Sequence, residues 1–234
     1  MVHVMVAAKS CGLLQIPEIT SVIALARKPV QVEDVKSPKL KSVIISDYEH
    51  YPEDVKAEFA GADACICTVA VTPMRSRGVD LAEVKRICQT CTLAGFKAMY
   101  EAGPSKPFRF LYLSAEGTPR DLTKKPLFMG EYRLMRSFVL HGETENMVLA
   151  YGEEHEGIKV CVARPGTITS SLTFWRTAQA KLFGFANMFT RAIPNVSREE
   201  LAAALLDQVV HGFEKGPLTN ADLIRLGCSA LKAL

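Results

Sequence analysis

The sequence predicts an α/β fold, in which a doubly wound parallel sheet is covered by helices on both faces. Short segments rich in β-branched residues alternate with longer helical segments, an order typical of parallel sheets. The predicted strands are continuous apolar runs, as in strands that are buried on both faces. Hydrophobic residues make up 48% of the 234-residue chain, which is enough for one large core, and no linker divides it. We therefore expect a single domain over residues 1–234.

Five segments are predicted as strands, because each is an apolar run that closes on a polar or turn residue. They are Ser21–Arg27, Ser42–Ser46, Ala62–Val69, Phe108–Ser114 and Ile158–Ala163. Residues Val2–Ala7 are compatible with an additional first strand. The stretch from there to Pro17 is too short for a turn and a full helix, so the first βα unit is expected to be truncated.

Longer segments with a helical pattern lie between and after these strands. They are Tyr51–Phe59, Val79–Ala102, Tyr132–Glu153 and Arg198–Glu214. Ser197 is followed three residues later by Glu200, the spacing of a capping box that begins a helix. Thr173–Thr190 is predicted as an aromatic-rich helix that packs on the core or covers a substrate, because it has too few basic residues for a membrane-surface helix. Residues 167–234 are expected to form a small C-terminal substrate or lid part.

Composition excludes several classes of protein. The net charge of +3, with both signs interspersed, predicts neither a nucleic-acid partner nor a membrane partner. Most of the seven cysteines lie in apolar runs, as free thiols do in a reducing compartment. Cys88 and Cys91 form a CxxC without a second pair at zinc spacing, so we interpret them as structural thiols and predict no metal site. The start of the chain lacks the pattern of a signal peptide, and a cytoplasmic location is expected.

Residues that follow the strands are candidates for a ligand site, because ligands of open α/β sheets bind at the carboxyl ends of the strands. Arg27 and Lys28 follow the first long strand, where a basic pair can hold the 2′-phosphate of NADP; a solvated strand end is the alternative. Asp47 follows the next strand, at a place that suits contact with adenine. Small residues from Thr68 to Ala70 would let the backbone approach a dinucleotide.

Two further strand ends predict a carbonyl reduction site. Ser114 ends one strand, and eighteen residues later Tyr132 begins a helix with Arg136 one turn on. A tyrosine hydroxyl can donate a proton to a developing alkoxide, a serine can orient the carbonyl, and a nearby cation lowers the pKa of the phenol. The alternative is that Tyr132 is only a residue of an amphipathic helix. Pro165, in the turn after the last strand, is expected to line the nicotinamide side of the cofactor site.

These segments, in this order, resemble the short-chain dehydrogenase/reductase superfamily and most closely its atypical branch, the Tat-interacting-protein-like and epimerase-like NADP-binding proteins, many of them fungal. The likeness covers residues 17 to 230. It is carried by PEITSVIALARKP, FAGADACICTVAVT, FRFLYLSAEG, the Tyr132 helix with GETEN, VARPGTIT and LTNADLIRLG. The resemblance implies a Rossmann-like fold, NADP as the cofactor and hydride transfer as the reaction.

The chain departs from this family at its first nucleotide-binding loop. The family has a Gly-x-x-Gly-x-x-Gly turn there, whose backbone amides hold the pyrophosphate. In this chain Gly12 is the only glycine before the first long strand. Lys9 and Ser10 are alternative phosphate contacts. Cofactor affinity is therefore expected to be reduced.

A second departure lies in the catalytic helix, where the family has Tyr-x-x-x-Lys followed directly by Gly-Glu. Here Arg136 stands four residues after Tyr132, but Gly142 comes only after five more residues, Ser137–His141, that read as an insertion. Five residues rotate a helix by about 500°, which leaves its two parts about 140° out of register. Either Arg136 keeps the position of the lysine, or His141 takes it and Tyr132 no longer aligns.

The leading functional prediction is an NADP-dependent oxidoreductase that acts on a small carbonyl or hydroxyl compound, in a fungal secondary-metabolite pathway. The alternative is a degenerate Rossmann-fold protein without redox activity, acting as a binding or regulatory partner or as a redox-neutral cyclase or isomerase. A further explanation for both departures from the family pattern is that the gene structure was misassigned at the N-terminus and at residues 137–141. The expected partner is a small molecule, and a monomer or a homo-oligomer paired through long helices is consistent with the sequence.

Overall fold

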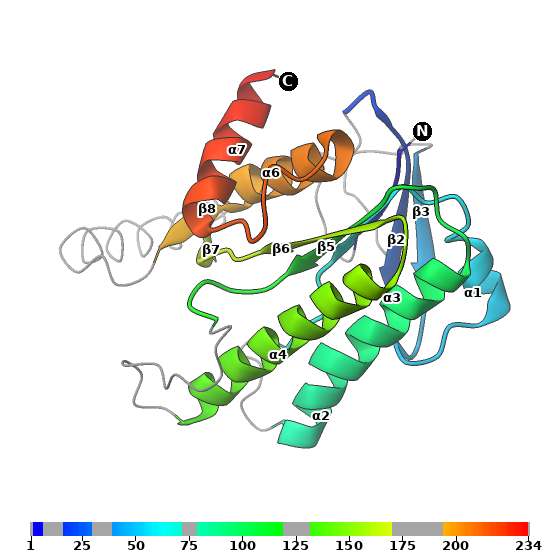
Figure 1. Cartoon of the computed structure of the whole chain (residues 1–234), viewed down its shortest axis with the longest axis horizontal. Helices are drawn as coiled ribbons and strands as arrows, with labels where there is room; N and C mark the ends of the chain where they lie inside the picture. The colour runs from blue at the N-terminus through cyan, green and yellow to red at the C-terminus, as the bar shows by residue number, and fades with distance from the viewer. Residues whose placement is uncertain are drawn as a thin grey trace.

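A computed structural model describes residues 2–6, 16–29, 39–71, 79–118, 132–169 and 194–233, with the backbone alone for residues 2–6 and 132–138. Its main element is a six-stranded sheet with strand order β3-β2-β1-β4-β5-β6 (Figure 1). Every pair of neighbouring strands is parallel. The strands are β1 Val2–Val6, β2 Ile19–Ala26, β3 Leu40–Ile44, β4 Ala64–Cys67, β5 Phe108–Leu113 and β6 Ile158–Ala163. The predicted doubly wound parallel sheet is confirmed.

The strand pairing explains where the observed bounds differ from the expected ones. Strand β3 begins at Leu40, two residues before its predicted start, because Leu40 pairs with Val22 and the ladder then continues to Ile44 opposite Ala26. The N-terminal strand β1 lies in the middle of the sheet, between β2 and β4. The sequence pattern indicated a strand there but not its central position.

Helices cover both faces of the sheet. On one face lie α3 and α4, and on the other lie α6 and α7 (Figure 1). The helices are α1 Glu53–Ala57, α2 Leu81–Lys85, α3 Cys91–Glu101, α4 Tyr132–Glu154, α6 Arg198–His211 and α7 Asn220–Ala233. The capping box predicted at the start of α6 is confirmed, since Glu200 N donates to Ser197 Oγ at 3.1 Å and Ser197 N donates to Glu200 Oε2 at 3.0 Å.

The segment predicted as one long helix, Val79–Ala102, contains a π-helical turn, η2, over Arg86–Thr90 between α2 and α3. Side chains of this turn are bound to neighbouring segments. Gln89 Nε2 donates to Glu143 Oε2 of α4 at 2.6 Å, and Val71 N donates to Cys88 Sγ at 3.4 Å. The turn therefore connects α4 with the loop after β4. A periodicity of 3.6 residues does not reveal such an added residue in a turn.

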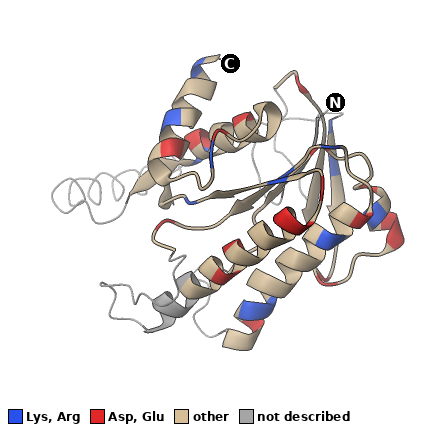
Figure 2. Cartoon of the chain, viewed as in Figure 1, with Lys and Arg blue, Asp and Glu red and all other residues tan. Residues whose placement is uncertain are grey.

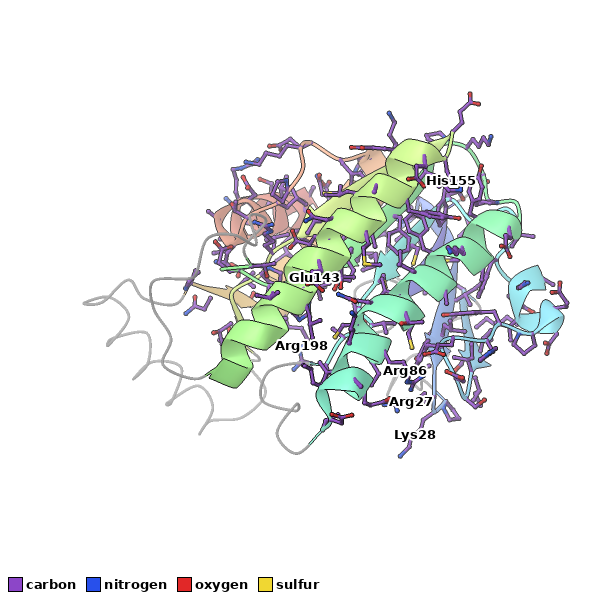
Figure 3. All side chains as sticks on the ribbon, turned by 60° about the horizontal axis from the view of Figure 1, so that its bottom comes forward. Arg27, Lys28, Arg86, Glu143, His155 and Arg198 are labelled. Atoms are coloured by element: carbon purple, nitrogen blue, oxygen red, sulfur yellow. The ribbon has the colours of Figure 1, made fainter. Side chains whose placement is uncertain are left out.

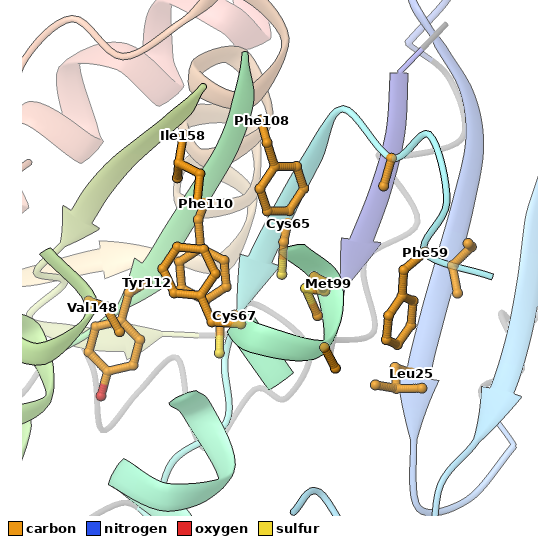
Figure 4. Close-up of a cluster of buried hydrophobic side chains, with 14 of the residues drawn as sticks. Leu25, Phe59, Cys65, Cys67, Met99, Phe108, Phe110, Tyr112, Val148 and Ile158 are labelled. Carbon is orange, nitrogen blue, oxygen red and sulfur yellow. The ribbon is translucent and has the colours of Figure 1, made fainter. Parts of the chain in front are cut away.

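The core on the α3–α4 face is rich in aromatic side chains (Figure 4). Phe110 of β5 stacks on Phe96 of α3, with 3.8 Å between the ring centroids and 7° between the ring planes. Cys65 and Cys67 project into the same cluster from β4. Burial raises the pKa of Cys67 to about 11, so this thiol is protonated and packs as an apolar side chain.

On the opposite face, α6 and α7 cross at a glycine. A Cβ atom on Gly227 would lie 2.1 Å from the carbonyl oxygen of Glu200, so the two helices approach as closely as they do only because residue 227 lacks a side chain. The residues packed between this pair and the sheet include Leu205, Leu218 and Leu223, all nearly or fully buried.

The C-terminal part contains elements that the pattern did not predict. Two short parallel strands, β7 Thr167–Thr169 and β8 Asn195–Ser197, flank the predicted helix Thr173–Thr190, which lies outside the described residues. Leu218 forms a parallel bridge with Ala163 and so extends the large sheet beyond β6. Charges of both signs are mixed over the helices (Figure 2), and no helix in the described ranges is long and apolar enough to cross a bilayer.

Candidate functional site

The carboxyl ends of the parallel strands share one edge of the sheet, and most of the predicted site residues lie along it. Arg27 and Lys28 follow β2, and Asp47 comes three residues after β3. The remaining described positions are Thr68 and Ala70 after β4, Ser114 after β5 and Pro165 after β6. The parallel topology therefore brings together residues that are up to 138 positions apart in the sequence (165 − 27). Gly12 lies outside the described residues.

The basic pair at the end of β2 is exposed to solvent. Figure 3 labels Arg27 and Lys28 near the lower edge of the view, at the end of β2. Within the described parts of the chain, neither member of the pair forms an ion pair with a carboxylate. Two cations without a carboxylate partner among the described residues fit an anionic ligand.

Asp47 is bound to side chains rather than open to a ligand on all sides. Its Oδ1 accepts from Glu49 N at 3.0 Å and lies 3.5 Å from Arg86 Nη1, and its Oδ2 lies 3.0 Å from His50 Nδ1. The hydrogen bond from His50 is the main cause that holds the pKa of Asp47 below its usual value. The expected contact with adenine would have to form beside this network.

Arg86 is the centre of that network. Its guanidinium binds Glu49 at 3.0 Å and Glu83 at 2.7 Å, in addition to Asp47. The ligand atoms of Asp47, Glu49 and His50 lie within 4.8 Å of one another, a spacing that could hold a cation. Since Arg86 already supplies positive charge to two of the three groups, we assign no metal to this cluster.

A small cavity of about 30 Å³ lies on the α3–α4 side of the sheet, and this volume suits about one water molecule. Its lining includes Tyr48, Val69, Cys91 and Thr92, which come from the loops after β3 and β4 and from the start of α3. Burial raises the pKa of Cys91 to about 11, which agrees with the structural role predicted for this thiol.

Ser114 is buried at the end of β5. Its amide donates to Ala163 O at 2.8 Å, which continues the pairing of β5 with β6 by one residue. The chain then turns through Gly117, whose φ is +83°, and the Oγ1 atom of Thr118 comes to 3.4 Å from Ser114 Oγ. Two hydroxyl groups therefore meet at the predicted substrate position, although the sequence pattern indicates only that of Ser114.

His141 faces the sheet from α4. It is 4% exposed, and its Nδ1 lies 3.2 Å from the hydroxyl of Tyr112, which is itself fully buried on β5. Burial lowers the pKa of His141 and raises that of Tyr112, so both groups are held in their neutral forms. Ser114 follows Tyr112 by two residues, so the two belong to the same side of the strand.

The unbroken helix α4 fixes the phase between its predicted site positions. At about 100° per residue, the step of nine residues from Tyr132 to His141 amounts to two and a half turns, so the two positions lie on opposite sides of the helix axis. Arg136 is about 140° from His141, whereas position 137 is about 40° from it and one turn nearer the carboxyl edge. The side chains of Tyr132 and Arg136 lie outside the described residues.

A buried ion pair next to the site was missed. Glu145 of α4 is fully buried, and both of its carboxylate oxygens bind the guanidinium of Arg164, with 3.0 Å between Oε1 and Nε and a short contact between Oε2 and Nη2. The pair attaches α4 to the turn after β6. Its sequence signal was an arginine directly after an apolar strand, together with a glutamate inside the GETEN segment.

No family model matches the sequence, and no curated protein matches it. Solved structures share its fold. A short-chain dehydrogenase family protein from Francisella tularensis subsp. tularensis SCHU S4 is 12% identical with a TM-score of 0.57, and the match covers 94% of this chain and 97% of that one. Vestitone reductase from alfalfa (Medicago sativa) is 17% identical with a TM-score of 0.57, over 93% of this chain and 75% of that one.

A dTDP-glucose 4,6-dehydratase from Streptomyces venezuelae, in a structure with NAD bound, is 11% identical with a TM-score of 0.62, over 99% of this chain and 81% of that one. At these identities the comparisons establish architecture. The chain thus has the Rossmann-like fold found in short-chain dehydrogenases, reductases and nucleotide-sugar dehydratases.

Proposed function

We propose that the chain is an NADP-dependent oxidoreductase that acts on a small carbonyl or hydroxyl compound. The observation that carries this proposal is the arrangement along the carboxyl edge of the sheet, where an exposed basic pair lies at the β2 end and the hydroxyls of Ser114 and Thr118 lie at the β5 end. A dinucleotide that crosses this edge joins the two ends. Reductases and an NAD-containing dehydratase among the similar structures support the same assignment.

In this proposal the chain's residues bind and orient the reactants. Arg27 and Lys28 hold the 2′-phosphate, and the backbone from Thr68 to Ala70 lies along the dinucleotide. Pro165 lines the nicotinamide side of the cofactor site. Ser114 orients the substrate carbonyl by a hydrogen bond. The cofactor, when bound, supplies the hydride. The edge fits the phosphate end of NADP better than the pyrophosphate, because Gly12 alone stands where the family has three glycines.

The helix register favours His141 over Arg136 in the position of the family's lysine. His141 lies on the same side of the structure as Tyr112 and Ser114, while the backbone positions of Tyr132 and Arg136 are about 180° and about 140° around the helix axis from it. We therefore propose that His141 takes this position as a neutral group that is 4% exposed, binds Tyr112 and supports the Ser114 end of β5 from beneath the site. A neutral histidine does not provide the fixed positive charge by which a lysine lowers the pKa of a neighbouring acid.

The cofactor assignment predicts a difference between NADPH and NADH. Replacing Arg27 and Lys28 together by alanine should weaken NADPH binding by at least about tenfold, since a charge-assisted hydrogen bond contributes about 1.5–3 kcal/mol. The affinity for NADH should stay within about twofold. Cofactor fluorescence titration measures both, and Lys159→Ala, at the opposite end of the sheet, is the control. Equal affinities of the wild type for the two cofactors would contradict NADP selectivity, and absence of binding at millimolar concentration would overturn the oxidoreductase proposal.

A second candidate is a redox-neutral role, as a cyclase, an isomerase or a binding protein. It is favoured by one observation, the neutral His141 in the lysine position with Tyr132 two and a half turns away, on the opposite side of the helix axis. Within the oxidoreductase proposal, Tyr132→Phe tests whether Tyr132 is the catalytic acid. If Tyr132 is the acid, the variant loses nearly all NADPH oxidation with a panel of small ketones. If the phase of α4 instead places His141 at the site, Tyr132→Phe keeps at least half of any wild-type turnover while His141→Ala loses it. Wild-type NADPH binding without oxidation of the cofactor would support the redox-neutral role. The cytoplasmic location and the role in secondary metabolism stay predictions.

A further inference from the structure

Asn220, the first residue of α7, joins three connecting segments at the carboxyl edge. It is 4% exposed. Its Oδ1 accepts from Gly166 N at 2.8 Å, its Nδ2 donates to Asn195 O at 3.0 Å, and its own amide donates to Glu116 Oε2 at 3.2 Å. One amide side chain therefore links the turn after β6 to strand β8, and its backbone links both to the loop after β5.

The turn held by Asn220 lies directly beside the candidate substrate position. Glu116 N donates to Pro165 O at 2.8 Å, and Glu116 is two residues after Ser114. On the other side, Thr167 N donates to Pro194 O at 2.8 Å, and a Cβ atom on Gly166 would lie 1.9 Å from that same oxygen. The backbone at Pro165 and Gly166 is thus enclosed by the β5 loop, by Pro194 and by the side chain of Asn220.

We propose that Asn220 is a positioning residue that sets the Pro165–Gly166 turn and so shapes the nicotinamide side of the cofactor site. The inference rests on the proposed function, in which Pro165 walls that side. An asparagine suits this task because it offers one acceptor and two donors from a single planar group. Gly166 N and Asn195 O belong to different segments, so both can be satisfied at once only if the turn and β8 stay in place.

The side chain of Asn220 does not serve as the N-terminal cap of α7. The cap is formed by its neighbours, with Thr219 N donating to Asp222 Oδ2 at 2.9 Å and Asp222 N donating to Thr219 Oγ1 at 3.3 Å. The Asn220 side chain contributes no hydrogen bond to this cap, and both of its partners lie outside α7.

A matched control exists in Gln208. Its Oε1 accepts from Glu214 N at 2.8 Å, and it is 3% exposed, so it is another buried amide that holds a loop backbone. That loop follows α6 and includes none of the predicted cofactor contacts. Asn220→Ala and Gln208→Ala thus remove the same kind of interaction from two different places.

The first experiment measures amide hydrogen exchange in both variants without any ligand. Asn220→Ala should speed exchange at Gly166 and Thr167 at least tenfold more than at the amides of β5, and Gln208→Ala should leave the ratio unchanged. Equal acceleration at all amides of Asn220→Ala would mean a general loss of stability and would overturn the proposal. This readout does not depend on cofactor binding, so it separates failure of this inference from failure of the proposed function.

The second experiment compares NADPH with adenosine 2′,5′-bisphosphate, which carries only the end of the cofactor assigned to Arg27 and Lys28. Asn220→Ala should weaken NADPH binding at least fivefold and leave the bisphosphate within twofold, and Gln208→Ala should change neither. Loss of both ligands in equal measure, or of neither, would overturn the positioning role.

A milder variant covers the case in which Asn220→Ala fails to fold. Asn220→Asp keeps the acceptor for Gly166 N, loses the donor to Asn195 O and places a carboxylate beside that of Glu116. Combining it with Glu116→Gln removes the repulsion between the two carboxylates. The double variant should recover NADPH affinity relative to Asn220→Asp alone, and no recovery would contradict the assigned geometry.

Discussion

The side chain of His141 shows how burial decides the chemistry available to a site. In water its imidazole would be partly charged near neutral pH, but in this chain it is enclosed between α4 and β5 and bound to Tyr112. The same histidine therefore has a clear role in stability. A buried neutral histidine favours the folded state only while the solution does not protonate it.

The stability of the protein should fall on acidification because of His141. Its folded pKa lies below that of the unfolded chain, so the unfolded state binds more protons as the pH falls through about 6.5. This contribution is fully present above that pH and is lost below it, by at most about 1.4 kcal/mol for each pH unit.

Urea denaturation between about pH 7.5 and about pH 5 measures this effect, with the slope taken from the free energy of unfolding. His141→Gln should flatten the dependence, because glutamine fills a similar volume without titrating. His155→Gln is the control, since His155 lies at the end of α4 and contacts Tyr151 and Tyr100 instead of the sheet. An unchanged slope in His141→Gln would contradict the assignment.

The positions of single residues could be predicted where strand ends alone determine them, but not where a distant partner does, and the roles assigned to these residues stay predictions. Ser114 and Arg27 follow apolar runs, so their place at the carboxyl edge could be inferred locally. One partner of Asp47 is Arg86, 39 positions away, and Asn220 binds Gly166 across 54 positions. Nothing in the local sequence distinguishes such residues from other polar residues near a helix start.

At the level of elements, the crossing of α6 and α7 depends on a single missing methyl group. Glycine inside a helix normally costs about 1 kcal/mol relative to alanine. At Gly227 the sign should reverse, because the added Cβ would meet the backbone of Glu200 and force the helices apart.

Gly227→Ala should therefore lower the free energy of unfolding, by about 1–3 kcal/mol. Gly95→Ala in α3 is the comparison, since its Cβ would meet only the hydroxyl end of Tyr51, at 2.7 Å, and that side chain can move. Chemical denaturation of both variants measures the difference. A Gly227→Ala variant at least as stable as the wild type would contradict the close packing of α6 on α7.

Element types were more predictable than element details. Strand Ile158–Ala163 and the start of α6 match their predictions because an apolar run and a capping box are local signals. The π-helical turn Arg86–Thr90 and the strands β7 and β8 do not have such signals. The π turn is fixed by side-chain bonds to other segments, and each of the two strands is only three residues long.

At the level of the whole molecule, the sheet followed from the alternation of apolar runs and helices, but the strand order did not. The position of β1 depends on pairing with β2 and β4, and a five-residue stretch carries no sign of which neighbours it takes. The candidate site depends on that order, because the order determines which strand ends are adjacent.

Strand β1 is also the only direct connection, among the described strands, between two parts of the sheet. One part consists of β3 and β2, and Arg27 and Lys28 follow β2. The other part consists of β4, β5 and β6, and Ser114 follows β5 while Pro165 follows β6. A dinucleotide that spans the edge would therefore contact both parts of the sheet, which are connected through the five residues of β1. Binding and strand pairing must then reinforce each other, since a ligand that needs both parts in place favours the state in which β1 is paired. A bound cofactor would thus stabilise the pairing of β1 in the middle of the sheet.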